Sequence, residues 1–381
     1  MVENAVNSHL STLNPMSHDF TTRSIHSGRY AESSAVPIFQ GINAPLHDGV
    51  EYVSAVGGVG GPTIESMEQL VADLEGASWS IAAPSGMAAI SNVLFGLLQS
   101  GDRVVAHRCI YSYASRLLNG DLTEKWGVTV EWVDMRNLDQ LKNALQKPTK
   151  LVYFDPIANP AMHLLDTAAI AERAKQAGAI VVTDNTLLSP YLFKPLDLGV
   201  DVVLHSATKY LAGHGDALAG VISGRDPELG QTLTKMRTFL GGFLAPMNAF
   251  LVIRGIRTLP FRMERHCDNT LEVLEWLKTR PEVASIRYAG WSEQASSSGL
   301  PAFGGMLSFT MKEGVDLKKF RYGLKICRPW GSLGDIETLV ALPAADEVRD
   351  IPPRLVRMAI GLEAPKDIIS DLEQALDHAK V

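Results

Sequence analysis

Short apolar runs alternate with helical patterns along the middle of the chain, from about residue 63 to residue 240. Runs such as 103–106, 150–154 and 180–183 are rich in β-branched side chains, a pattern typical of strands buried in a parallel sheet. Stretches between them, such as 166–177, carry apolar residues at helical spacing. This alternation predicts an α/β domain with a mainly parallel central sheet.

The flanking regions follow other patterns. A helix is expected after Thr63 and should end at Gly76, and residues 248–278 predict a long helix interrupted near Pro260. Beyond it, short strands at 283–288, 304–311 and 354–360 alternate with helices, the last of which ends the chain. We therefore expect three parts: an N-terminal arm with an extended course, a main domain, and a smaller α/β C-terminal domain, at residues 1–60, 61–247 and 248–381.

Composition narrows the class of protein. The 381 residues are 46% hydrophobic and 20% charged, with a formal net charge of −7, so we expect no nucleic-acid partner. The longest uncharged stretch, 76–101, contains Pro84, Asn92 and Gln99, and the N-terminus lacks a signal-peptide pattern, so we expect a cytoplasmic protein outside membranes. Cysteines are few and histidines unclustered, which predicts free thiols and no metal site.

Polar residues follow two of the predicted strands. Asp184 comes directly after the run 180–183, and Ser206, Thr208 and Lys209 follow the run 202–204. Ligands of parallel sheets bind beyond the carboxyl ends of the strands, so one ligand would meet a carboxylate, two hydroxyls and an amine. Pyridoxal 5′-phosphate requires such a set. From spacing alone, Lys209 as a surface lysine and Asp184 as a strand-end cap remain equally open.

The segment Pro84-Ser85-Gly86-Met87 precedes an apolar helical pattern. Ser85 is a natural N-cap, and Gly86 lets the backbone approach an anion closely. Exposed N–H groups and the helix dipole would together hold a phosphate. The alternative is that Ser-Gly marks only the start of a helix without a ligand, which is the more common case.

The chain resembles the Cys/Met-metabolism family of pyridoxal-phosphate enzymes. The resemblance is carried by residues 183–192 (TDNTLLSPYL) and 195–216 (PLDLGVDVVLHSATKYLAGHGD), and it extends from about Thr22 to the C-terminus. The family includes cystathionine γ-synthase, cystathionine γ- and β-lyase, methionine γ-lyase and O-acylhomoserine sulfhydrylase. It implies the aspartate-aminotransferase-like fold type I, pyridoxal 5′-phosphate as the cofactor, a small amino-acid substrate, and a homodimer or homotetramer in which the arm contacts a neighbouring subunit.

The resemblance assigns roles to the strand-end residues. Gly86 and Met87 would offer backbone N–H groups to the cofactor phosphate, beside the N-cap Ser85, and Ser206 and Thr208 would add hydroxyls. Asp184 would keep the pyridine nitrogen protonated, because a nearby opposite charge favours the charged form. Lys209 would form the Schiff base and, once freed, remove the Cα proton.

Four further residues match family positions. Tyr111 would stack on the ring and serve in proton transfer, although a core tyrosine is the alternative from sequence. Asn159 would lie beside the 3′-oxygen, but the preceding 155–157 (DPI) departs from the family's Glu-(Ser/Thr)-Pro. Ser332 would line the substrate site. Arg357 would clamp the substrate carboxylate, for which a planar fork is suited.

The family's arm usually supplies a Tyr and an Arg to the neighbour's phosphate. Here the register set by Pro62-Thr63 places Val56 and Gly58 at those positions, inside the run Val56–Gly61. We expect the backbone N–H groups of that run to compensate. Gly58→Ala should then weaken cofactor binding and Gly58→Arg strengthen it. Tyr113, and the run 343–347 without the family's Ser-x-x-His, also depart from the usual pattern.

The leading hypothesis is a pyridoxal-phosphate lyase that eliminates the γ-substituent of a homoserine- or methionine-like amino acid. The departures fall on groups that relatives use for substrate side chains. Loss of the cation at Gly58, with Asp48 and Glu51 nearby in sequence, would tolerate a neutral or cationic side chain, so a γ-substituted homoserine such as canavanine is one expected substrate. The alternatives are a γ-replacement enzyme (cystathionine γ-synthase or O-acylhomoserine sulfhydrylase), which shares the early steps, and a cystathionine β-lyase. A non-catalytic relative is a remote fourth.

Overall fold

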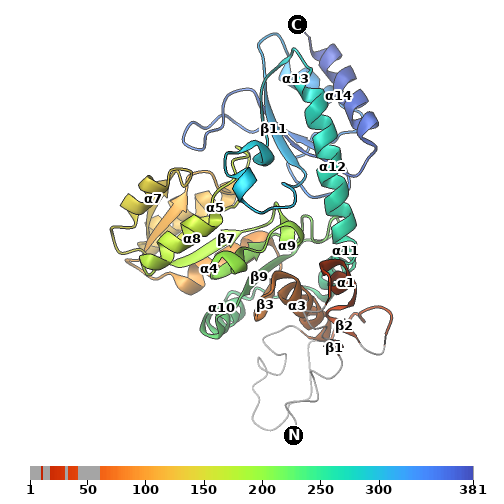
Figure 1. The fold of residues 1–381 in the computed structure, drawn as a ribbon. Helices are drawn as coiled ribbons and strands as arrows, with labels where there is room; N and C mark the ends of the chain where they lie inside the picture. Colours follow the sequence, from red (N-terminus) through yellow and green to blue (C-terminus); the bar gives the residue numbers. More distant parts are fainter. Residues whose placement is uncertain (1–9, 12–17, 31–32, 42–60, 381) are drawn as a thin grey trace, which may run out of the picture.

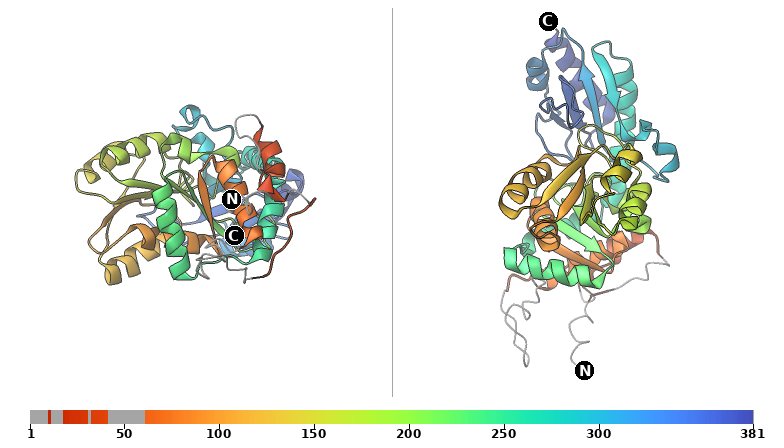
Figure 2. Two further views of the ribbon diagram at one scale, coloured as in Figure 1. Left: turned by 90° about the horizontal axis from the view of Figure 1, so that it is seen from below. Right: turned by 90° about the vertical axis from the view of Figure 1, so that its left-hand side faces the viewer.

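The computed structural model describes residues 10–11, 18–30, 33–41 and 61–380. Two sheets dominate it, a seven-stranded one formed by residues 79–224 and a four-stranded one near the C-terminus (Figure 1). Viewed from the side, the C-terminal sheet stands beyond one end of the larger sheet (Figure 2). The protein thus has the mixed α/β fold expected, with a mainly parallel central sheet.

The larger sheet has the strand order β3-β9-β8-β7-β6-β4-β5. Strands β4 to β8 are mutually parallel, and β9 is antiparallel to both of its neighbours, β3 and β8. Consequently β3 runs in the same direction as the parallel strands. The strands are β3 (Trp79–Ala83), β4 (Arg103–His107), β5 (Thr129–Val133), β6 (Leu151–Phe154), β7 (Ile180–Asp184), β8 (Val202–His205) and β9 (Gly220–Gly224).

Helices cover both faces of this sheet because alternate strand residues point to opposite sides. Val104, Tyr153 and Val182 join one apolar cluster with helix α4, whereas Val105 and Val181 join another with α7 and α8. Helix α10 packs on α4, and α3 packs on β3. The helices are α3 (Pro62–Glu75), α4 (Gly86–Leu97), α5 (Ser112–Leu117), α6 (Thr123–Trp126), α7 (Leu138–Ala144), α8 (Thr167–Gln176), α9 (Ser189–Leu192) and α10 (Pro227–Leu240).

Two helices lead from the large sheet to the C-terminal one. They are α11 (Pro246–Ile256) and α12 (Leu259–Lys278), and α12 rises along the side of the molecule (Figure 1). The predicted interruption is confirmed, but it falls at Arg257 and Thr258. Pro260 occupies the first turn of α12, where its missing N–H has no partner to lose, so it begins the second helix.

The C-terminal sheet is antiparallel, with the order β10-β11-β13-β12. Its apolar side chains pack with those of α12 and of the last helix, α14. The elements are β10 (Val283–Arg287), β11 (Met306–Met311), α13 (Leu317–Gly323), β12 (Leu339–Ala341), β13 (Leu355–Ala359) and α14 (Pro365–Ala379).

The described part of the N-terminal arm is not simply extended. It forms helix α1 (Phe20–His26) and a pairing of β1 (Leu10–Ser11) with β2 (Arg29–Tyr30). Asp19 caps α1 by accepting a hydrogen bond from the Thr21 N–H, and the buried Arg23 pairs with Asp73 of α3 at 3.0 Å. The sequence analysis did not predict this short capped helix. Val56, Gly58 and residues 57–60 lie outside the described residues, so the expectations for them stay predictions.

Candidate active site

A cavity of about 280 Å³ lies at the edge of the large sheet where the parallel strands end. All of the residues that the sequence singled out for the site line it, and we list them here: Ser85, Gly86, Met87, Tyr111, Asn159, Asp184, Ser206, Thr208, Lys209, Ser332 and Arg357. Most follow β3, β4, β6, β7 or β8, which share one direction. Ser332 and Arg357 come from the C-terminal part and close the opposite side.

Asp184, the last residue of β7, is buried at the floor of the cavity. Its Oδ1 accepts hydrogen bonds from both the N–H (3.0 Å) and the hydroxyl of Thr186. Its Oδ2 accepts no hydrogen bond from a described residue and is free to meet a ligand. Burial raises the pKa of Asp184, and the Thr186 hydrogen bonds and the charge of His205 oppose that shift. A cationic ring nitrogen beside the carboxylate would also oppose the rise in the pKa of Asp184.

Lys209 reaches into the cavity from the segment after β8. Its Nζ donates a hydrogen bond to Ser332 Oγ at 2.6 Å, across the boundary between the two sheets. Burial lowers the pKa of Lys209, and the charge of Arg357 lowers it further, against an opposing effect of Asp335. Because only the unprotonated amine is a nucleophile or a base, this environment suits Lys209 for both tasks.

The N-terminus of α4 forms a place for an anion. Ser85 caps the helix, its Oγ accepting a hydrogen bond from the Ala88 N–H at 3.0 Å. A Cβ on Gly86 would lie 2.7 Å from the Cβ of Ser206, so only glycine fits where these two segments meet. The hydroxyl of Thr208 lines the cavity but donates to the Ala219 carbonyl at 3.1 Å, so a phosphate would have to compete for this donor.

Arg357 lies in β13 and is only 8% exposed. Its Nη2 donates to the carbonyls of Gly331 (2.9 Å) and Ser332 (2.7 Å). Its Nε is buried and has no hydrogen-bond partner among the described residues, an unmet donor that a carboxylate could satisfy. Burial lowers the pKa of Arg357 to about 10, so the guanidinium remains charged at neutral pH.

Tyr111 lies at the mouth of the cavity and is 39% exposed, which rules out the alternative of a core tyrosine. Its ring centroid lies 5.8 Å from that of Tyr113, whose ring is more exposed still. Burial raises the pKa of Tyr111, and the charges of Tyr113 and Asp184 add to the rise. The tyrosine ring is therefore available to stack on a planar ligand at the floor.

Two lining residues with polar side chains, Asp155 and Thr186, were not predicted as site residues. Thr186 links the end of β7 to the segment after β8, because its hydroxyl donates to Asp184 and accepts from the Ser206 N–H at 2.8 Å. Asp155 Oδ2 accepts from the Tyr111 N–H at 3.0 Å, and its Oδ1 is buried with no partner among the described residues. Burial, reinforced by the charge of Asp184, raises the pKa of Asp155 well above its ordinary value. Asp155 directly follows the strand 151–154, and this position could have identified it as a site residue from the sequence.

The residues present fit pyridoxal 5′-phosphate. The floor offers a carboxylate oxygen for the pyridine nitrogen, a buried amine for the carbonyl carbon, and a capped helix start for the phosphate. In the described part of the chain, no group of three or more His, Cys, Asp or Glu side chains could hold a metal ion. No helix in that part is long and apolar enough to cross a membrane. Fold and site together define a pyridoxal-phosphate enzyme of fold type I.

Comparison with known proteins gives the family. Residues 43–377 match the model of the Cys/Met metabolism PLP-dependent enzymes, and the chain belongs to this family. An L-methionine gamma-lyase from Fusobacterium nucleatum is 39% identical over 336 residues, 84% of this chain and 85% of that protein. A cystathionine beta-lyase from Lactococcus lactis is 35% identical over 381 residues, 93% of this chain and 98% of that protein.

Solved structures agree with this assignment. Cystathionine gamma-lyase from Lactobacillus plantarum, complexed with L-serine, superposes with a TM-score of 0.90 at 32% identity, covering 95% of this chain and 99% of that one. The structure of metB from Corynebacterium glutamicum gives a TM-score of 0.90 at 36% identity, covering 96% and 99%. The fold type, the cofactor and the role as an enzyme of amino-acid metabolism are thereby confirmed.

Proposed function

We propose that this enzyme eliminates the γ-substituent of an uncharged, methionine- or homoserine-like amino acid, giving a 2-oxo acid and ammonia. The observation that carries the proposal is the distribution of charge in the cavity. Among the described residues that line it, the ionisable side chains are Asp155, Asp184, Lys209 and Arg357. Once these are assigned to the cofactor, its surroundings and the substrate carboxylate, none is left for a charged substrate side chain.

The bound cofactor supplies an electron sink that makes the protons at Cα and then Cβ of the substrate acidic. Arg357 binds the α-carboxylate through its free Nε edge and so fixes which bond at Cα faces Lys209. The Lys209 amine, with its lowered pKa, takes the Cα proton, and Ser332 holds its Nζ in place at 2.6 Å. With the cofactor bound, Asp184 would keep the ring nitrogen protonated and Tyr111 would cover the ring.

The remaining lining of the cavity is apolar. Ile90, Leu187, Leu218 and Leu333 contribute to it, and Leu218 is 57% exposed at its rim. Apolar walls favour a thioether or an ether-linked chain over the second ammonium and carboxylate of cystathionine, which would be desolvated without a partner. This supports methionine, or an O-linked homoserine analogue with an uncharged substituent, ahead of cystathionine. The walls favour canavanine less, because its guanidinooxy group is partly protonated near neutral pH.

Gamma-replacement is the second candidate. The cystathionine gamma synthase from Xanthomonas oryzae, in complex with aminoacrylate and cysteine, is 33% identical in sequence with a TM-score of 0.89. Replacement uses the same residues up to the step at which a nucleophile adds. A β-lyase is third, on the strength of the Lactococcus relative.

The test is a product analysis on the purified holoenzyme with methionine, canavanine, O-acetylhomoserine and cystathionine. We expect 2-oxobutanoate, ammonia and the released leaving group from an uncharged substrate. A dependence of turnover on added thiol, with a new thioether product, would replace elimination by γ-replacement. Pyruvate from cystathionine would indicate β-elimination, and no product from any of them would contradict the proposal.

We further propose that the enzyme works in the cytoplasm as at least a dimer, with a tetramer built from two dimers as the favoured form. The end of α10, the segment after it and the first turn of α11 expose Phe239, Leu240, Phe243 and Met247. Exposed apolar residues gathered in this way are typical of interfaces. The three buried free cysteines suit a reducing compartment. A fully active monomer in light scattering would contradict the oligomer.

A further inference from the structure

A hairpin of the C-terminal part contacts the backbone of the loops that carry Tyr111 and Asn159. It spans residues 346–351, between β12 and β13, and its ends are paired by hydrogen bonds from Asp346 N–H to the Ile351 carbonyl (2.9 Å) and from Ile351 N–H to the Asp346 carbonyl (2.8 Å). None of its residues lines the cavity. Arg349 and Asp350, at its tip, point at the main domain.

Arg349 ties the two loops together. Its Nη2 donates to the Ile110 carbonyl at 3.0 Å and to the Asn159 carbonyl at 3.2 Å. Ile110 is fully buried directly before Tyr111, so the acceptor belongs to the same peptide group as the Tyr111 N–H. That N–H donates to Asp155 at 3.0 Å. The peptide that leads into Tyr111 is therefore held at both of its polar atoms.

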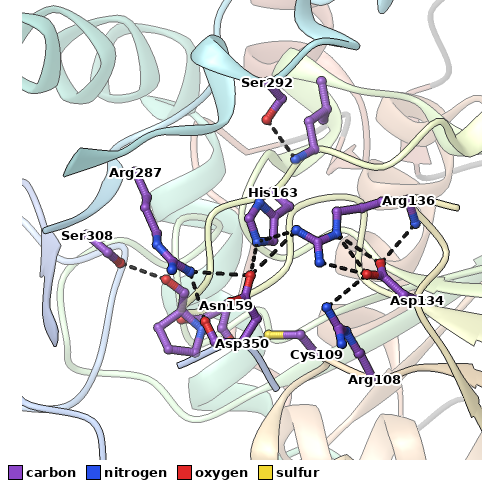
Figure 3. Close-up of polar contacts among 12 residues, drawn as sticks. Arg108, Cys109, Asp134, Arg136, Asn159, His163, Arg287, Ser292, Ser308 and Asp350 are labelled. Atoms are coloured by element: carbon purple, nitrogen blue, oxygen red, sulfur yellow. Dashed lines mark hydrogen bonds and ion pairs between the residues drawn. The ribbon is translucent and has the colours of Figure 1, made fainter. Parts of the chain in front are cut away.

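Asp350 anchors the hairpin to the main domain (Figure 3). Its Oδ2 lies 2.7 Å from His163 Nε2 and 3.5 Å from Nη1 of both Arg136 and Arg287. Arg287 of β10 also donates to the Asp350 carbonyl at 2.8 Å. Arg136 is shared with Asp134, which pairs with Arg108 as well. The carboxylate thus meets cationic or hydrogen-bonding groups from both halves of the protein.

The loop 159–164 is held by the C-terminal part at further points. Ser308 Oγ of β11 donates to the Pro160 carbonyl at 2.7 Å in a buried contact, and the Leu164 N–H donates to Ser292 Oγ at 3.1 Å (Figure 3). Together with Arg349 on the Asn159 carbonyl, these bonds fix both ends of the loop. The place of the Asn159 side chain in the cavity therefore depends on groups far from it in sequence.

We propose that Arg349 is a positioning residue for the cofactor, acting through Tyr111 and Asn159 from outside the cavity. The inference rests on the proposed contact of these two residues with the cofactor ring. A stacked ring and an amide must be held to within about half an ångström to act reproducibly. One guanidinium nitrogen that binds both loops keeps their separation fixed, and the Asp350 anchor keeps the guanidinium in place.

The test compares Arg349→Met, which keeps the length of the side chain but removes its donors, with Arg349→Lys, which restores a donor. Circular dichroism in the absorption band of the bound cofactor reports the orientation of its ring. We expect Arg349→Met to weaken this signal and to lower kcat roughly tenfold with little change in KM, because a hydrogen-bond donor to two carbonyls is lost. Arg349→Lys should recover much of both.

The matched control is Glu347→Gln, a change at an exposed position of the same hairpin. It should leave the dichroism, kcat and thermal unfolding midpoint as in the parent enzyme. Asp350→Asn should give a weaker form of the Arg349→Met signature, and it serves as the test if Arg349→Met does not fold. Unchanged dichroism and kcat in Arg349→Met, or in Asp350→Asn in that case, would overturn the positioning role.

Tyr111→Ala, which removes the stacking ring, and Asn159→Ala separate this inference from its premise. If both leave the cofactor dichroism unchanged, the assignment of these residues to the ring is wrong and the inference falls with it. If they change it and Arg349→Met does not, only the role of Arg349 is wrong. The dichroism needs no substrate, so a failure of γ-elimination in the product analysis is a separate result.

Discussion

The floor of the cavity and its outer wall are built in different ways. The floor is a set of strand ends in one parallel sheet, and Asp184 and Lys209 are placed there by short motifs that follow their own strands. The wall consists of Arg357, which lies in β13 of the separate antiparallel sheet, and Ser332, which lies in the segment before β12. The Lys209–Ser332 bond joins residues 123 positions apart.

This difference predicts how substitutions in each region should act. A strand end is fixed by the register of the sheet, so a floor residue keeps its place unless the main domain itself unfolds. The wall depends on how the C-terminal sheet lies against the main domain, which is decided by α12 and by contacts such as the Asp350 anchor. We therefore expect floor substitutions to remove chemistry and wall substitutions to change binding and alignment.

The largest effect should come from Lys209→Ala. Without the amine there is no base at Cα, and general-base catalysis alone is worth up to roughly 10⁴-fold in rate. The variant should still bind the cofactor without a covalent bond, because Asp184 and the α4 N-terminus are intact. Steady-state turnover and the absorption spectrum measure both effects, with the exposed Lys318→Ala as the control. Turnover near the normal rate would contradict the mechanism.

The two carboxylates of the floor should differ in effect. Asp184→Asn removes the charge that holds the ring nitrogen protonated, and we expect kcat to fall about 10²–10³-fold. Asp155→Asn leaves a group that can still accept from the Tyr111 N–H, so its loss should be much smaller. Single-turnover kinetics on both variants check the order. Equal losses would show that the pair acts as a unit.

Arg357→Lys probes the wall. A lysine keeps the charge but loses the planar fork, so we expect kcat/KM to fall about 10–100-fold, mostly through KM. Cofactor affinity, measured by titration of the apoenzyme, should change little. A fall in kcat with constant KM would mean that Arg357 aligns the reacting bond more than it binds the substrate.

The smallest effect on turnover is expected at Glu68 of α3, which contributes to the stability of the protein. Burial raises the pKa of Glu68 in α3 to about 7 although Arg237 and the Ala82 N–H, at 2.7 Å each, oppose the shift. Since the folded pKa lies above the ordinary value of 4.5, this contribution to stability is full below pH 4.5 and is lost as the pH rises through 7. The free energy of unfolding should fall by at most about 3 kcal/mol over that range.

Chemical unfolding at several pH values measures this loss. Glu68→Gln should be less stable overall, because Arg237 loses its partner, but its stability should vary less between pH 4.5 and 7. A variant that follows the same pH curve as the parent would show that other buried groups, such as Asp155, are responsible.

The sequence by itself predicted the strands of the large sheet and the meeting of Asp184 and Lys209 at one sheet edge, but the roles of these two residues came from the family resemblance. Apolar runs gave the strands at 103–107, 151–154 and 180–184 to within about a residue, since strand burial leaves a local pattern. Polar residues directly after such runs had to meet at one sheet edge, because parallel strands end together. The roles of Tyr111, Asn159, Ser332 and Arg357 came from the family resemblance, not from any local pattern.

Only the tertiary structure decided the rest. Nothing in the local sequence shows that Arg349 binds the carbonyls of Ile110 and Asn159, or that Asp350 meets His163, because these contacts join segments about 190 to 240 residues apart. Backbone carbonyls carry no side-chain signature, so their partners appear only when the chain is folded. Within the described part of the chain, Arg357 Nε and Asp155 Oδ1 are buried without a hydrogen-bond partner. Packing alone decides this, because the local sequence does not show which polar atoms become buried.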